Sequence, residues 1–212
     1  MKINKKTYVK NIVKRLSLIY PNAKITLKFS NPFELVIATI LAAQCTDKRV
    51  NIVTEKLFKK YKTPKDYIKT PLQEIEQDIK STGFFRNKAK HIKELAIKIV
   101  KDYEGKVPDS MKELTQLPGV GRKTANVVIS NCFDRNDGVI VDTHMIRIAQ
   151  LLGLTYEKDA VKIEKELNEL MEPKDYLYFS NLIIALGRNI CIARRPKCEI
   201  CPLNNICPSS RI

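Results

Sequence analysis

The stretch LPGVGRKTANVVIS, from Leu117 to Ser130, combines a glycine turn with a lysine. Gly119 and Gly121 flank one apolar residue, so the backbone can turn tightly and approach another surface without a Cβ in the way. The helix predicted after this turn begins with free N–H groups, which form an anion site together with the helix dipole. The stretch is therefore a candidate seat for a phosphate.

Lys123 falls in the first turn of that predicted helix, where the helix dipole disfavours a cation by about 0.3–1 kcal/mol. The same field, helped by partial burial, favours the uncharged amine, which is the nucleophilic form of a lysine. A lysine at this place can equally be a simple phosphate contact. Position alone does not decide between a nucleophile and a phosphate ligand.

The four cysteines Cys191, Cys198, Cys201 and Cys207 follow the spacing C-x6-C-x2-C-x5-C. Four thiolates hold either a tetrahedral zinc ion or an iron–sulfur cluster. Zinc fingers usually separate two pairs of ligands by a longer segment, whereas these four lie in one compact loop. Cysteines crowded in this way indicate metal in a reducing compartment rather than disulfides. The spacing favours a cluster and leaves zinc open.

Three basic residues, Arg194, Arg195 and Lys197, lie between the first two of these cysteines. A loop that is tied down at both ends can meet phosphates at little ordering cost, so the three are candidate contacts to the phosphates of a nucleic acid. A solvated surface loop is the alternative interpretation.

The hairpin LPGVGRKTA, the tetrapeptide VDTH from Val141 to His144, and the cysteine loop occur together in one chain. In order and spacing they resemble the endonuclease III family of DNA glycosylases, over about residues 32–208. The hairpin alone would indicate only DNA binding, but the three signatures together are specific. The resemblance implies an all-α helix-hairpin-helix glycosylase fold with a DNA-binding cleft between two helical domains. It also implies a [4Fe-4S] cluster on the four cysteines.

The resemblance assigns catalysis to Lys123 and Asp142. Lys123 would attack C1′ of a nucleotide extruded from double-stranded DNA, displace an oxidised or ring-fragmented pyrimidine, and leave a Schiff base from which β-elimination breaks the strand. Asp142, facing the lysine, would take a proton or stabilise positive charge on the sugar. From position alone Asp142 is equally an N-cap, and the two roles are compatible.

Gln44 in AAQCTD stands where the family carries a glutamine that inserts beside the orphaned base, with a polar helix end as the alternative. Phe84 in STGFFRNKA stands where relatives commonly have a leucine wedge. It departs from that pattern, but apolar wedges of several kinds enter duplexes, and packing at a helix end is the alternative. His144 is a phosphate or active-site contact by resemblance, or a core or capping residue. The hairpin contacts to DNA are expected from Gly119, Val120, Gly121, Arg122 and Thr124.

The chain has 212 residues and a formal net charge of +15, from 38 Lys and Arg against 23 Asp and Glu. This length can bury a substantial core in one or two domains. The charge favours nucleic acid as a partner, with a generally basic surface as the alternative. The longest apolar run, Leu35 to Ala43, is far shorter than the roughly 20 residues of a membrane span, so no membrane partner is expected. We expect a cytoplasmic, nucleoid-associated monomer.

The sequence pattern predicts helix for nearly every segment. Asn31-Pro32 and Thr46-Asp47 are clear helix starts, and Thr70 with Gln73 fits a capping box. The apolar segment that follows Pro32 should be a central buried helix. Cys45 and Cys132 are expected to be small buried residues, and His91 a solvated one. Further helices are expected over residues 89–103, 108–116, 143–152, 159–171 and 174–188, and a run Val139–Val141 is too short to build a sheet.

Composition places a domain boundary near the turn FDRNDG. The resemblance refines this to a helical barrel over residues 25–136 and a discontinuous cluster domain over 1–24 and 137–212. Two other functions stay open. One is a mismatch-specific or other monofunctional glycosylase of the same superfamily, and the other is a non-catalytic DNA-binding iron–sulfur protein.

Overall fold

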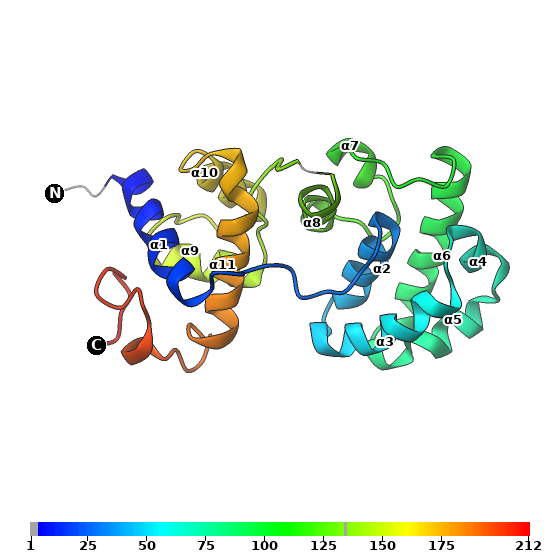
Figure 1. The fold of residues 1–212 in the computed structure, drawn as a ribbon, viewed down its shortest axis with the longest axis horizontal. Coiled ribbons are helices and arrows are strands. Elements are labelled where there is room, and N and C mark those ends of the chain that lie inside the picture. Colours follow the sequence, from blue (N-terminus) through cyan, green and yellow to red (C-terminus); the bar gives the residue numbers. More distant parts are fainter. Residues whose placement is uncertain (1–3, 134) are drawn as a thin grey trace. The chain divides into compact units, whose positions relative to one another are not determined.

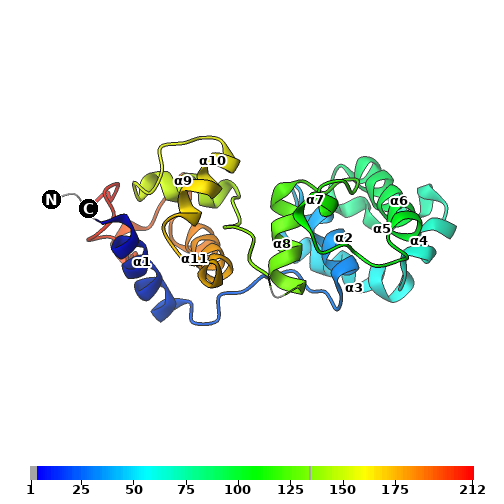
Figure 2. The same ribbon diagram turned by 90° about the horizontal axis from the view of Figure 1, so that it is seen from above.

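The computed structural model describes residues 4–133 and 135–212, and every regular element among them is a helix, which confirms the all-α prediction (Figures 1 and 2). The α-helices are α1 (Lys5–Ile19), α2 (Pro32–Ala42), α3 (Asp47–Lys60), α4 (Pro64–Lys69), α5 (Leu72–Ile79), α6 (Phe85–Asp102), α7 (Met111–Leu114), α8 (Arg122–Cys132), α9 (Thr143–Leu151), α10 (Ala160–Asn168) and α11 (Tyr176–Asn189). Short 3₁₀ turns are η1 (Lys80–Thr82), η2 (Pro173–Asp175) and η3 (Cys198–Ile200). None of the described helices is long and apolar enough to cross a membrane.

The helices form two compact units. The first, Thr26–Arg135, contains α2 to α8. The second joins the N-terminal segment through Ile25 to Asn136–Ile212 and contains α1 and α9 to α11, so it is discontinuous in sequence. That each unit corresponds to a domain with the boundaries expected from the sequence stays a prediction.

Helix α2 is the centre of the first unit. It packs against α3, α6 and α8, and α6 in turn packs against α4 and α5 (Figure 1). The Asn31 side chain accepts a hydrogen bond from the N–H of Glu34 at 3.0 Å, and Pro32 occupies the first helical position. The expectation of a central buried helix is confirmed by its buried side chains, Phe33, Leu35, Val36, Ile37, Ala38, Ile40 and Leu41.

Helix α11 is the centre of the second unit, where it packs against α1 and α9. α1 contributes Val9, Ile12 and Leu16 to this core, since the three lie on one face of the helix. The segment Val139–Val141 is buried in the same core without belonging to a strand. It leads directly into α9, and it therefore fixes the place from which that helix starts.

One expected capping box is wrong. Thr70 does not start α5, because its hydroxyl donates to the carbonyl of Asp66 at 2.8 Å and so closes α4 behind it. The capping box of this region lies one helix earlier, where Asp66 accepts from the backbone of Thr63 at 2.8 Å. The cap at Thr46, which accepts from the N–H of Arg49, is confirmed.

Candidate active site and metal centre

The hairpin Leu117–Gly121 turns the chain into α8 with its apolar residues inward. Val120 is only 6% exposed, and its N–H donates to the carbonyl of Leu117 at 3.1 Å. Gly119 and Gly121 are exposed, and Gly121 is the N-cap residue, so no side chain caps the first N–H groups of α8. The hairpin therefore presents backbone outward, and Val120 can meet a phosphate only through its main chain.

Gly119 cannot be another residue without strain, for two reasons. Its φ is +76°, and a Cβ built on it would lie 3.1 Å from the Cβ of His91. His91 is half-buried under the hairpin, so the expectation that this histidine is solvated is wrong. Sequence reasoning missed this support because His91 belongs to α6, far from the hairpin along the chain.

Lys123 is the second residue of α8 and is exposed. The sequence suggested that Lys123 is partly buried, and this expectation is wrong. From Ala125 onward α8 is anchored by a run of buried side chains that ends at Ser130. Arg122 is exposed and Thr124 half-buried on the same first turn. A rigid helix thus holds an accessible amine beside exposed glycine backbone.

Asp142 is the N-cap of α9, where one of its carboxylate oxygens, Oδ1, accepts from the N–H of Met145 at 2.9 Å. The capping interpretation is confirmed, and it fixes the orientation of the carboxylate. The segment before it is held by side chains of two other helices. Asn168 Oδ1 accepts from the N–H of Val139, and Ser180 Oγ accepts from the N–H of Ile140, both at 2.9 Å.

His144, two residues after Asp142, packs on α11. A Cβ built on Gly187 would lie 2.5 Å from His144 Nδ1, so the glycine is what allows the imidazole to approach the helix. His144 is half-buried. The core interpretation of His144 is thereby supported, and a contact with DNA stays a prediction. Lys123 belongs to the unit 26–135 and Asp142 to the other, so their pairing also stays a prediction.

Gln44 and Phe84 share an unusual backbone. Each is a non-glycine residue in the left-handed region, with φ of 55° and 47°, and such residues persist only where the surroundings hold them. Both are exposed, and Phe84 keeps 64% of its surface accessible. Simple packing at a helix end is therefore excluded for Phe84. Gln44 lies in the turn between α2 and α3, and Phe84 is the N-cap of α6 in the same unit.

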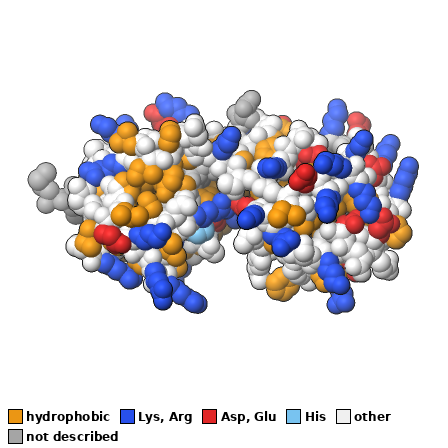
Figure 3. Space-filling model, turned by 60° about the horizontal axis from the view of Figure 1, so that its bottom comes forward, with side chains coloured by type: hydrophobic (Ala, Val, Ile, Leu, Met, Phe, Trp, Pro, Cys, Tyr) orange, Lys and Arg blue, Asp and Glu red, His pale blue; other side chains and the backbone are white. Residues whose placement is uncertain are grey.

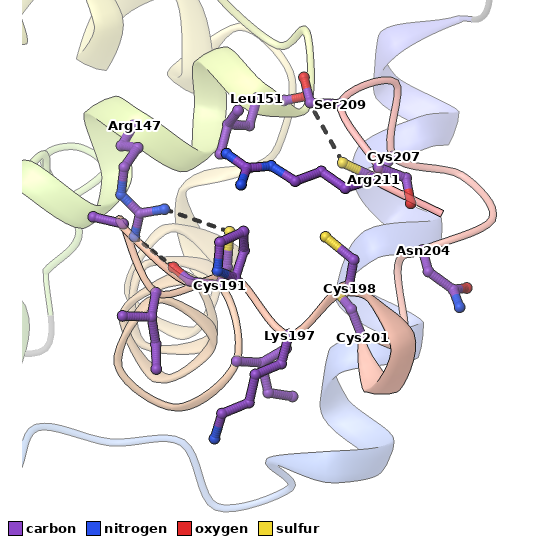
Figure 4. Close-up of a pocket in the computed structure, with 15 residues that line it drawn as sticks. Arg147, Leu151, Cys191, Lys197, Cys198, Cys201, Asn204, Cys207, Ser209 and Arg211 are labelled. Atoms are coloured by element: carbon purple, nitrogen blue, oxygen red, sulfur yellow. Dashed lines mark hydrogen bonds between the residues drawn. The ribbon is translucent and has the colours of Figure 1, made fainter.

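The four C-terminal cysteines line one cavity of about 150 Å³ (Figure 4). Burial raises the pKa of the thiols of Cys201 and Cys207. Backbone N–H groups oppose this shift, that of Leu203 at Cys201 and that of Ser209 at Cys207. Such half-buried, hydrogen-bonded thiols surrounding one space fit the donor set of an iron–sulfur cluster.

Arg147 of α9 reaches the same cavity. Its Nη1 lies 3.4 Å from Cys191 Sγ and its Nη2 donates to the Cys191 carbonyl at 2.6 Å, as Figure 4 shows. In the described part of the chain, no three His, Cys, Asp or Glu residues are grouped so as to hold a single metal ion. Sequence reasoning did not single out Arg147, since nothing near it in the sequence signals metal.

The basic residues Arg194, Arg195 and Lys197 are exposed between Cys191 and Cys198. The N–H of Lys197 donates to the carbonyl of Ile190 at 3.0 Å, which ties the end of this loop to the end of α11. Lys and Arg side chains are also spread widely over the molecular surface seen in Figure 3. The basic loop is thus one part of a generally positive protein, whose formal charge is +15.

Comparison with known proteins defines the class first. Residues 37–173 match the HhH-GPD superfamily of base excision DNA repair proteins, and residues 191–207 match the iron–sulfur binding domain of endonuclease III. The first match contains the hairpin, Lys123 and Asp142, and the second contains all four cysteines of the cavity.

The particular family follows from full-length relatives. The chain is 47% identical to endonuclease III of Synechocystis sp. over 208 residues, which cover 98% of this chain and 95% of the relative. It is also similar to the solved structures of a non-covalent endonuclease III–DNA complex and of a trapped endonuclease III–DNA covalent intermediate. Each has a TM-score of 0.92 and 42% identity over 96% of this chain, covering 95% and 96% of the solved chains. The chain belongs to the endonuclease III family, as the sequence motifs predicted.

Proposed function

We propose that this protein is a bifunctional DNA glycosylase and abasic-site lyase that acts on oxidised or otherwise damaged pyrimidines in double-stranded DNA. The observation that carries the proposal is Lys123, an exposed amine in the first turn of α8 directly after the glycine hairpin. An amine can form a covalent bond with C1′ of deoxyribose, and a solved relative at 42% identity is described as a trapped covalent intermediate with DNA.

The reaction begins after the damaged nucleotide has been extruded from the duplex. The uncharged Lys123 Nζ attacks C1′, the glycosidic bond breaks, and the base leaves as an anion that takes a proton from water. Asp142 accepts the proton that the lysine loses and stabilises positive charge on the sugar while the base departs. The ring then opens to a Schiff base, which acidifies the C2′ proton. Loss of that proton expels the 3′ phosphate, and water finally releases Lys123 from the product.

The DNA is held chiefly through its backbone. One phosphate binds at the start of α8, where it receives hydrogen bonds from exposed backbone N–H groups of the hairpin, including those of Gly119 and Gly121. Arg122 and Thr124 lie beside it. Arg194, Arg195 and Lys197 meet further phosphates. Gln44 and Phe84, both exposed on left-handed backbone, fill the space that the extruded nucleotide leaves in the duplex.

Cys191, Cys198, Cys201 and Cys207 hold a [4Fe-4S] cluster, whose chemical contribution when bound is four iron–thiolate bonds that cross-link the C-terminal loop. Arg147 orients the Cys191 ligand by its contacts with Sγ and the carbonyl oxygen. Since the cluster needs reduced thiols and the substrate is DNA, we place the protein in the cytoplasm, associated with the nucleoid.

Borohydride trapping tests the proposal. The protein is incubated with a duplex that carries thymine glycol or an abasic site, and the Schiff base is then reduced to a stable amine. We expect a covalent protein–DNA adduct that is lost in Lys123→Ala and kept in Lys101→Ala, which removes an exposed lysine of α6. Base release without an adduct would instead indicate a monofunctional glycosylase. Binding without release or adduct would indicate a non-catalytic DNA-binding protein.

A further inference from the structure

Lys88 is a buried lysine that the proposed chemistry does not use. It lies in the first turn of α6 and is only 4% exposed, so it cannot contact a phosphate of DNA. Its Nζ donates to two main-chain carbonyls, that of Leu41 at 2.8 Å and that of Thr82 at 2.8 Å. Burial lowers the pKa of this amine, while the nearby Cys45 opposes the shift.

The two carbonyls belong to the two segments that lead to the inserting residues. Leu41 is in the last turn of α2, three residues before Gln44. Thr82 is the last residue of η1, two residues before Phe84. One ammonium group therefore joins the end of α2 to the end of η1, although the two segments are some forty residues apart in sequence.

A cation suits this place. The last carbonyls of a helix have no intrahelical partner and carry the negative end of its dipole, so a buried ammonium group both satisfies them and is stabilised by them. The N–H of residue 88 also donates to the Phe84 carbonyl at 3.1 Å, but this is an ordinary helix bond that a substitution of Lys88 would keep. Neutral side chains of the same length could fill the space but could not join the two carbonyls.

We propose that Lys88 is a positioning residue that fixes Gln44 and Phe84 relative to one another, so that both enter the duplex as one unit. Gln44 and Phe84 have left-handed backbone that needs support from their surroundings, and Lys88 is bonded directly to the segments that precede them. The inference rests on the proposed insertion of these two residues. It does not depend on the chemistry of Lys123.

A double-mutant cycle on binding affinity tests this, with a duplex that contains a tetrahydrofuran abasic-site analogue, which the lysine cannot attack. The variants are Lys88→Met, Phe84→Ala, Gln44→Ala, and the pairs that combine Lys88→Met with each alanine change. If Lys88 acts through the two residues, each single change weakens Kd about tenfold and each pair also weakens it about tenfold. Independent effects would instead give about a hundredfold.

Lys93→Met is the matched control. Lys93 is on the same helix and its Nζ also donates to a main-chain carbonyl, that of Thr70, which does not lead to either inserting residue. The Kd of this variant should lie within about twofold of that of the unmutated protein. Its effect should add to that of Phe84→Ala, as expected for independent sites. A second readout is the fluorescence of 2-aminopurine placed opposite the analogue. At saturating protein its rise should be reduced in Lys88→Met and unchanged in Lys93→Met.

The outcomes separate the two proposals. If Phe84→Ala and Gln44→Ala leave both Kd and fluorescence unchanged, insertion itself is wrong. Suppose instead that the two alanine changes weaken binding, but that the effect of Lys88→Met is fully additive with theirs or is absent. Insertion then stands, and the positioning role of Lys88 is overturned. Circular dichroism melting identifies a variant that does not fold. In that case the cycle with Lys88→Gln, whose shorter side chain can reach one carbonyl but cannot bridge the two, decides by the same criterion.

Discussion

The helices α8 and α9 both begin beside a candidate catalytic residue, and their N-termini are built in opposite ways. α8 starts after Gly121, which offers no side chain to its first N–H groups, and Lys123 stands exposed in the first turn. α9 starts after Asp142, whose own carboxylate accepts from the N–H of Met145. The first end is left open for an outside anion, and the second is closed by the residue that would do chemistry.

The supports behind the two ends differ in the same way. The hairpin before α8 is held by close packing, with Gly119 pressed on His91 and Val120 buried. The segment before α9 is held by hydrogen bonds that its Val139 and Ile140 N–H groups donate to the side chains of Asn168 and Ser180. The end proposed to bind phosphate thus has no side-chain cap, whereas the end proposed to position a carboxylate uses that carboxylate as its cap.

We expect the largest effect from a substitution that keeps the capping role of Asp142 and removes its charge. Asparagine caps a helix as well as aspartate does but carries no charge, so Asp142→Asn should slow single-turnover base release by about 10²–10⁴-fold with little change in stability. Asp142→Ala should lose the same activity and also about 1 kcal/mol of unfolding free energy. Quenched-flow assays and denaturant titrations measure the two quantities. Full activity in Asp142→Asn would reduce the residue to a cap.

Closing the open end of α8 should have the next largest effect. Gly121 has a φ of −91°, and nothing lies within 4 Å of a Cβ built on it, so Gly121→Asp can adopt the native backbone and cap the helix. We expect stability to be kept or raised, and Kd for duplex DNA to weaken by at least about tenfold, because the carboxylate takes the N–H groups and repels phosphate. Unchanged DNA affinity, measured by anisotropy, would show that this helix end does not bind phosphate.

The two glycines of the hairpin give a smaller, purely structural contrast. Gly119→Ala should lower the free energy of unfolding by about 1–2 kcal/mol, since its φ is +76° and its Cβ would crowd His91. Gly121→Ala meets neither obstacle, and its poorer N-cap is offset by the lower entropy of the unfolded chain, so it should change stability by less than about 0.5 kcal/mol. Urea titration of both variants provides the measurement. Equal losses would mean that the hairpin is not held in the way its packing indicates.

The parts of this fold that the sequence predicts are the local ones. Asn31-Pro32, Thr46 and Asp142 start helices as expected, because an N-cap acts on backbone groups two or three residues away. The capping box expected at Thr70 failed for the same kind of reason. A threonine hydroxyl can bond backward to close one helix as well as forward to open the next, and the local pattern fits both.

What the sequence misses is long-range support. His91 under Gly119, Ser180 behind Ile140 and Arg147 at Cys191 each join segments far apart in the chain, and no local spacing names such partners. Lys88 did leave a signal, since it precedes Ile92 by four residues and so shares the buried face of α6. The exposure of Lys123 was missed because burial depends on how neighbouring segments pack, which the hairpin motif does not specify.

The most direct test of the account is to locate the covalent bond. After borohydride reduction of the reaction with an abasic-site duplex, the DNA is digested to its attached sugar remnant and the protein is cut into peptides for mass spectrometry. We predict that the remnant is on Lys123, in the peptide that carries the start of α8. A remnant found instead on another lysine or on the N-terminal amine would contradict the assignment of Lys123 as the nucleophile.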